Sequence, residues 1–556
     1  MIGHSCMQGA RKVRKHCARG PEPRIMRTTG LLYPILLCAL QAPAVLSFSV
    51  PSPSSKSARG VASLRAGFMD SIGKIASNLG GGSGAAVGRP LFEGAGGPSW
   101  EDLRSGAVDT HRGRILEENK RLWDEGAGPP HTDAKLRLFG STGEPRVTFY
   151  RDTAAWCPYC QKVWMMLEEK QIPYRVEKIN MRSYGEKPSW YLSKVPSGLL
   201  PAIGLDGQLI TESLVIMQTL EAEFPEPRRM LPDRDSSEFQ EAVRLLNLER
   251  ELFRWWCQFV FRSGDSSRGA LEKTLDQVNG ALASSPGPWF LPSSAPADEA
   301  ATGSPDDGFS LVDLTYVPHL ERMAASTAYW KGLQIRGNPR WASINRWFEA
   351  LEMRETYMAS KSDFYTHVQD IPPQYGNGQS IQRAASMKAT IDGADGSWSL
   401  PLPPLHPTEG LEPVSNANDT GDDGARHEAV YKLAGNAEAV ARFACRGAGR
   451  GSGWPLLPGR APLSDPNAIP NLDILPDVDH CLRRVASALL KGSLEEDQAA
   501  LQRGLASNGG DRGTAAAVVA SLEYLRDRVG VPRDMSYPAA RQLRAHLNWA
   551  IGVLEN

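Results

Sequence analysis

The pattern of apolar and polar positions predicts a region of alternating strands and helices in the first half of the chain. Short runs of β-branched and aromatic residues predict one strand from Arg146 and three more over Tyr174–Asn180, Leu200–Leu205 and Gln208–Thr211. Their length and their bounding turn residues distinguish them from the longer helical patterns that follow. We therefore predict a four-stranded sheet in this part of the chain.

Amphipathic helices are predicted between these strands. One opens at Cys157 and runs through Leu167, and another starts at Glu212-Ser213 and runs to Phe224. A turn at Asp206-Gly207 joins the last two strands as a hairpin. The resulting order, βαβ followed by ββα, predicts a thioredoxin-like α/β domain over residues 144–228.

Helical periodicity predicts two further units on either side of this domain. Residues 96–143 carry a helical lead-in, which we expect to lie against the α/β domain. Residues 235–372 carry an all-helical domain, with a capped start suggested by Asp235 and Glu238. Aromatic residues in its first helix are more often core than part of a site, so we assign them to the core.

The second half of the chain mixes low-complexity segments with helices. Residues 286–308 are predicted to form an exposed loop, and residues 373–425, rich in Gly, Ser, Pro, Asp and Asn, a disordered linker. Four helix candidates within residues 426–556 predict a small helical bundle, in which no motif indicates a function.

Composition adds limits to this division. A chain of 556 residues is long enough for two or three folded units. The 62 basic and 63 acidic residues leave a net charge of −1, so no overall field attracts nucleic acid.

Residues 1–95 are predicted to be a bipartite targeting sequence and a linker, not a folded domain. A basic segment precedes the apolar run GLLYPILLCAL, and a Ser-, Arg- and Ala-containing stretch from Phe48 carries no acidic residue before Asp70. A signal peptide followed by a transit segment resembles the bipartite presequences of algae with secondary plastids, so plastid delivery is expected. The alternatives are secretion, a cytoplasmic location, or a start at Met26 with the earlier residues never made. The mature part shows no apolar anchor for a membrane.

The chemistry of the chain centres on Cys157-Pro158-Tyr159-Cys160. A thiol at a helix N-terminus faces unpaired N–H groups and the positive end of the helix dipole, which favours the thiolate. Cys157 is therefore predicted to be a nucleophile. A zinc half-site is less favoured, since neither Cys257, Cys445 nor Cys481 forms a second ligand pair, and we expect no metal. The five cysteines after the presequence form no disulfide framework.

Three segments together resemble a known family. CPYCQKVWMMLEEKQIPY, EKPSWYLSKVPSGLLPAI and GQLITES are similar to the glutathione-binding domain of cysteine-type glutathione transferases, the branch with the omega, lambda and dehydroascorbate reductase classes. The resemblance implies a thioredoxin-like domain followed by the all-α transferase domain, with glutathione as co-substrate. A homodimer is one assembly that it leaves open.

The resemblance also assigns roles to individual residues. A cis bond at Leu200-Pro201 would present the backbone of Leu200 to the cysteinyl part of glutathione as an added strand. Glu212 and Ser213 would bind the γ-glutamyl end. An ordinary loop proline and a simple helix cap are the alternative interpretations of these two pairs.

Two more residues gain a role only from this set. Lys187 matches the omega-class lysine that meets the glycine carboxylate, although alone it would be interpreted as a surface lysine. Tyr159 is expected to pack over the tripeptide or to serve as scaffold. Trp156 either lines the second-substrate site or shields the thiol, and the sequence leaves both open.

These observations predict a glutathione-dependent thiol transferase or reductase. Cys157 would form a mixed disulfide with glutathione and reduce a disulfide, dehydroascorbate or a glutathionyl adduct. Cys160 would resolve that disulfide, or be a buried small hydrophobe. The rival interpretation is a non-catalytic module that uses the same fold for binding or redox sensing.

Overall fold

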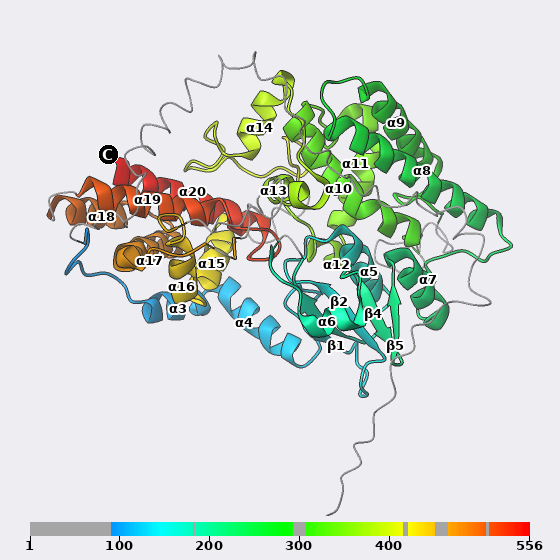
Figure 1. Ribbon diagram of the computed structural model, residues 1–556, viewed down its shortest axis with the longest axis horizontal. Helices are drawn as coiled ribbons and strands as arrows, with labels where there is room; N and C mark the ends of the chain where they lie inside the picture. Colours follow the sequence, from blue (N-terminus) through cyan, green and yellow to red (C-terminus); the bar gives the residue numbers. More distant parts are fainter. Residues whose placement is uncertain are drawn as a thin grey trace, which may run out of the picture.

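The computed structural model describes residues 90–556 except 182–183, 293–306, 415–420, 451–464, 467 and 508–510. The predicted presequence therefore lies almost wholly outside the described residues. In Figure 1 the green helices that follow the sheet in the chain lie above it and to its right, and a yellow to red helical bundle lies on the left. Among the described residues, none of the helices is both long and apolar enough to cross a membrane.

The sheet has five strands, in the order β1-β3-β2-β4-β5. The strands are β1 (Leu136–Arg137), β2 (Val147–Asp152), β3 (Tyr174–Ile179), β4 (Ala202–Leu205) and β5 (Gln208–Thr211). β2 and β3 are parallel, while β4 pairs antiparallel with β2 and with β5. The four predicted strands are thus confirmed, and the short edge strand β1 was not predicted.

Helices α5 (Pro158–Glu169), α6 (Ser189–Lys194) and α7 (Ser213–Glu223) complete the thioredoxin-like domain. Asp206 and Gly207 both have positive φ, 49° and 82°, as a two-residue type I′ hairpin turn requires. The predicted turn is therefore confirmed, and it sets the register in which Leu205 faces Gln208.

The transferase helical domain begins with α8 (Ser237–Val260) and α9 (Arg268–Ser284). It continues with α10 (Leu311–Lys331), α11 (Ala342–Glu352), α12 (Glu355–Met358) and α13 (Phe364–Tyr375). α10 is buried along its whole length and starts at a capping box formed by Ser310 and Asp313. The cap of α8 is Ser236, whose hydroxyl accepts from the N–H of Phe239. The prediction of Asp235 as the cap is wrong by one residue, since both side chains can fill that role.

Two low-complexity predictions are wrong in part. Within residues 286–308, Trp289, Phe290 and Leu291 are buried, and only the part over 293–306 lies outside the described residues. Within the predicted linker, residues 373–414 are described and include α14 (Ala385–Ile391) and a buried Trp398, which packs edge-on against Tyr365 at 4.8 Å. Composition misled here because a few large apolar side chains were enough to fix these segments.

The remaining helices form one unit, which we call the helical domain (residues 90–124 and 421–556). Its helices are α3 (Trp100–Asp109), α4 (His111–Asp124), α15 (Gly421–Ala434), α16 (Ala437–Ala444), α17 (Leu475–Lys491), α18 (Glu495–Ser507), α19 (Arg512–Arg526) and α20 (Tyr537–Glu555). Figure 1 shows α3 and α4, in blue, beside the yellow to red helices of the C-terminal region.

This arrangement corrects the prediction for the lead-in. Leu103 and Ala107 of α3 are buried in the same core as Val430 and Leu482, not against the sheet, and only α4 also reaches β1. An amphipathic face shows that a helix is buried but not which core buries it. The sheet domain and the transferase helical domain lie between residues 125 and 420, and we call them together the transferase part. The transferase part is therefore inserted between the two halves of the helical domain.

Candidate active site

Cys157 lies at the end of the loop that follows β2 and caps helix α5. Its Sγ accepts from the N–H of Cys160 at 3.4 Å, and Pro158 occupies the first turn, where its missing N–H costs nothing. The side chain is largely buried, at 6% exposure. The structure thus puts the thiol at a helix N-terminus, as the sequence predicted.

The residue before a cis proline lies directly beside this thiol. The Leu200-Pro201 bond is cis, as the family resemblance implied. Cys157 Sγ is 3.9 Å from the carbonyl oxygen of Leu200. Tyr191 steadies this loop, because its hydroxyl donates to the carbonyl of Leu199 at 2.7 Å.

Glu212 and Ser213 stand at the start of α7. Glu212 has φ 67° and ψ 112°, a backbone conformation that L side chains rarely adopt, and its exposed side chain makes no capping bond. The simple-cap interpretation of Glu212 therefore finds no support. A strained, exposed carboxylate at a helix start is a feature typical of binding sites.

Lys187 and Tyr159 come from two segments near the cysteine loop. Burial lowers the pKa of Lys187, while Cys157, Cys160 and Asp152 act in the opposite direction. The Lys187 ammonium lies 6.0 Å from the ring centre of Tyr191. The half-buried Tyr159 ring packs edge-on against His319 of α10, with ring centres 5.8 Å apart. Tyr159 thus links the cysteine loop to the transferase helical domain.

Cys160 is fully buried on the inner side of α5. Burial, the adjacent Cys157 and Asp152 raise its pKa well above the usual value. Ligand atoms of Asp152, Cys157 and Cys160 lie within 4.8 Å of one another. A closed structural zinc site needs four ligands, and the described residues offer three at this place.

Sequence reasoning missed three side chains at this site. Asp152 accepts from the N–H of Trp156 at 2.7 Å, and its place at the end of β2 was a local signal that could have pointed to it. Lys162, next to Tyr159, is buried, which lowers its pKa to about 8.

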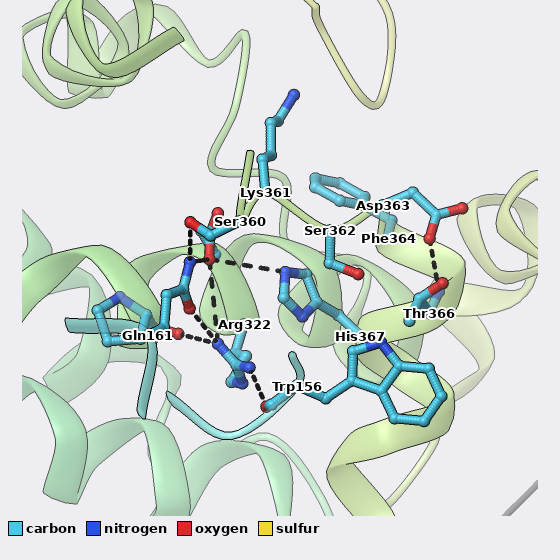
Figure 2. A network of polar contacts seen from close by, with 12 residues as sticks. Trp156, Gln161, Arg322, Ser360, Lys361, Ser362, Asp363, Phe364, Thr366 and His367 are labelled. Atoms are coloured by element: carbon cyan, nitrogen blue, oxygen red, sulfur yellow. Dashed lines mark hydrogen bonds and ion pairs between the residues drawn. The ribbon is translucent and has the colours of Figure 1, made fainter. Parts of the chain in front are cut away.

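The third missed residue is Arg322, in the middle of α10. Its guanidinium donates to the carbonyl of Trp156 at 2.5 Å and to the side chain of Gln161 at 3.3 Å, as Figure 2 shows. No local pattern could reveal it, since it lies far along the chain from the cysteines. The core assignment of the α8 aromatics holds for Trp256 and Phe259, which are buried.

Comparison with known proteins fits this geometry. Residues 156–223 match the glutathione S-transferase N-terminal domain. Over 213 residues the chain is 27% identical to glutathione S-transferase DHAR2 of Arabidopsis thaliana. The aligned residues make up 38% of this chain and 86% of the relative. The matched residues carry a glutathione S-transferase N-terminal domain, and the chain is similar to cysteine-type glutathione transferases. These similarities indicate an enzyme of the glutathione transferase or oxidoreductase kind.

Other similar proteins match different shares of this chain. It is 31% identical over 122 residues to glutathione S-transferase DHAR3, chloroplastic, of A. thaliana, which is 22% of this chain and 42% of that protein. Among solved structures, glutathione transferase Omega 3C of Trametes versicolor is similar over 44% of this chain and 95% of its own, at 23% identity and a TM-score of 0.33.

Proposed function

We propose that this glutathione transferase reduces disulfide-type and related acceptors through a mixed disulfide at Cys157. The observation that carries the proposal is the contact between the Cys157 thiol and the Leu200 carbonyl beside the cis Pro201. A cysteine nucleophile beside the backbone of the residue before a cis proline suits a thiol tripeptide that binds as an added strand.

Two exchange steps describe the reaction. The Cys157 thiolate attacks the glutathionyl sulfur of an acceptor R–S–S–glutathione, and the R thiolate leaves and takes up a proton. The thiolate of a second glutathione then attacks the glutathionyl sulfur on Cys157. Glutathione disulfide leaves, and the Cys157 thiolate is restored.

The surrounding residues would bind the tripeptide. The backbone of Leu200 would pair with its cysteinyl unit, and Glu212 and Ser213 would hold the ammonium and carboxylate of its γ-glutamyl end. Lys187 would pair with the glycine carboxylate and Tyr159 would cover the bound chain. The place of the Lys187 ammonium beside the Tyr191 ring and the exposed side chain of Glu212 support these roles.

Cys160 is proposed as the resolving thiol. It would attack Cys157 Sγ in the mixed disulfide, release glutathione and form a Cys157–Cys160 disulfide. Two glutathione molecules then reduce this disulfide in two exchange steps and leave as glutathione disulfide. The closeness of the two thiols supports this role. Cys160→Ser should then accumulate the glutathione adduct of Cys157 in mass spectra, and unchanged turnover without that adduct would assign Cys160 to the core.

Dehydroascorbate is the proposed physiological acceptor, with two glutathione thiols supplying its two electrons. Several relatives are named after dehydroascorbate reductase, and two of them are chloroplastic. A plastid location for this chain is part of the same proposal, in line with the predicted presequence.

The test compares turnover of hydroxyethyl disulfide and dehydroascorbate by the wild type, Cys157→Ser and Cys257→Ser. Cys257 is a half-buried cysteine of α8 outside the site and serves as the matched control. Loss of turnover in Cys157→Ser alone supports the proposal. Equal, negligible rates in all three proteins would favour the non-catalytic binding module.

A further inference from the structure

The helical domain touches the catalytic loop through Trp156, the residue before Cys157. We call residues 529–534, which connect α19 to α20, the latch loop. The Trp156 indole N–H donates to the carbonyl of Val531 at 3.3 Å, and the guanidinium of Arg533 lies 4.6 Å from the ring centre. The indole is only 1% exposed. It therefore points into a domain contact, not toward an open substrate site.

The fit around this indole is tight. A Cβ atom added to Gly530 would lie 2.5 Å from Cζ2 of Trp156, closer than real Cβ contacts allow. Tyr184 packs edge-on against the other side of the indole, with ring centres 5.1 Å apart. Trp156 is thus enclosed by side chains from two domains.

The latch loop is itself fixed to the transferase part. Its Val531 N–H donates to the hydroxyl of Thr366 at 3.1 Å, and its Val531 carbonyl also accepts from Ser362 at 2.5 Å. Arg544 of α20 donates to the carbonyl of Val529 at 2.8 Å and pairs with Asp363 at 2.6 Å. Figure 2 shows Ser362, Asp363 and Thr366 on the segment beside Trp156.

The backbone of Trp156 is held as firmly as its ring. Asp152 accepts from its N–H, and Arg322 donates to its carbonyl oxygen. Because this carbonyl belongs to the peptide that joins Trp156 to Cys157, strain that the packed indole passes to its own backbone reaches the loop that carries the thiol.

We propose that Trp156 is a positioning residue through which the helical domain fixes the catalytic thiol at the N-terminus of α5. This proposal rests on the proposed function of Cys157. It replaces the two alternatives of the sequence, since Trp156 neither lines a substrate site nor merely shields the sulfur. The matched family domain ends at residue 223, so the latch loop lies outside it.

Gly530→Ala tests the latch with one added methyl group. The matched control is Gly504→Ala, because a Cβ there would lie 2.3 Å from the Phe92 ring, in the core of the same domain but away from the latch. Trp156→Phe is the second variant; it removes the indole N–H and keeps an aromatic ring.

Two measurements separate positioning from stability. We expect Gly530→Ala and Trp156→Phe to lower kcat about tenfold to a hundredfold, with the KM for glutathione changed less than about threefold. The second measurement is the rate of Cys157 alkylation by iodoacetamide at a series of pH values, without glutathione, followed on the Cys157 peptide by mass spectrometry. We expect the pH profile of this rate to shift to higher pH in both variants. Gly504→Ala should keep wild-type kcat per folded molecule and a wild-type alkylation profile.

The outcomes are distinct. Wild-type kcat and alkylation in both latch variants would overturn the proposal, and so would equal changes in Gly504→Ala. If the wild type itself turns over no acceptor, the proposed function fails, and the alkylation profile still decides whether the latch positions Cys157.

Discussion

Replacing Asp363 by Asn should weaken the interface between the transferase part and the helical domain and so lower the free energy of unfolding. Asp363 Oδ2 accepts from Arg544 at 2.6 Å, and both side chains are only 1% exposed. Asp363 Oδ1 also caps α13 by accepting from the N–H of Thr366 at 3.0 Å. Asn caps helices about as well as Asp, so this substitution removes the charge and keeps the cap.

The magnitude follows from the charge that is left behind. Removing one partner of a buried ion pair costs about 3–5 kcal/mol, because the other charge stays buried without compensation. The rings of Tyr365 and Trp398 lie 4.7 and 4.9 Å from the Arg544 guanidinium and offset part of this cost. We expect a loss near 3 kcal/mol.

The assay is urea unfolding at pH 7, followed by tryptophan fluorescence and circular dichroism on the same samples. Asp206→Asn is the control, since its pair with Arg146 is half exposed, at 53% and 46%, and screening by solvent leaves this pair little effect on stability. Replacing Asp363 and Arg544 together by apolar residues should recover stability. If Asp363→Asn loses no more stability than Asp206→Asn, the argument from burial is wrong.

Other groups give further predictions. Burial lowers the pKa of His319 to about 4 from 6.5, so the unfolded state binds more protons between these values and stability falls as the pH drops from 6.5. This group should contribute about 1.4 kcal/mol per pH unit, and His319→Gln should remove that slope in urea unfolding at pH 7, 6 and 5, whereas the exposed His111→Gln should not. Lys187→Met should raise the KM for glutathione about tenfold with little change in kcat, as steady-state kinetics would show, and the exposed Lys120→Met should change neither. Asp313→Ala should cost at least about 3 kcal/mol, since its carboxylate accepts from Ser310, Phe290 and Trp347. Asp102→Ala, in the exposed capping box of α3, should cost clearly less stability in the same urea unfolding assay, and equal losses would contradict the role of burial.

Local patterns predicted the parts of the site that are close in sequence. The strand, the Cys157–Cys160 turn and the helix after it follow from neighbouring residues. The cis bond at Leu200-Pro201 came from the family resemblance, because a proline alone does not indicate its isomer.

Contacts between distant segments could not be predicted in this way. The sequence around Trp156 does not indicate that its indole N–H donates to the Val531 carbonyl. Nothing near Gln161 indicates the contact with Arg322. The lead-in was assigned to the wrong core for the same reason, since apolar spacing marks a buried face without naming its partner.

The insertion of the transferase part between two halves of the helical domain affects synthesis of the chain. α3 and α4 leave the ribosome long before α15 and α20, whose side chains complete their core. Domains generally fold as they emerge, so the thioredoxin-like domain can close around Cys157 while these early helices still expose apolar surface. A chain cut short before α20 would keep every proposed glutathione contact, yet carry an unfinished core that chaperones would have to cover.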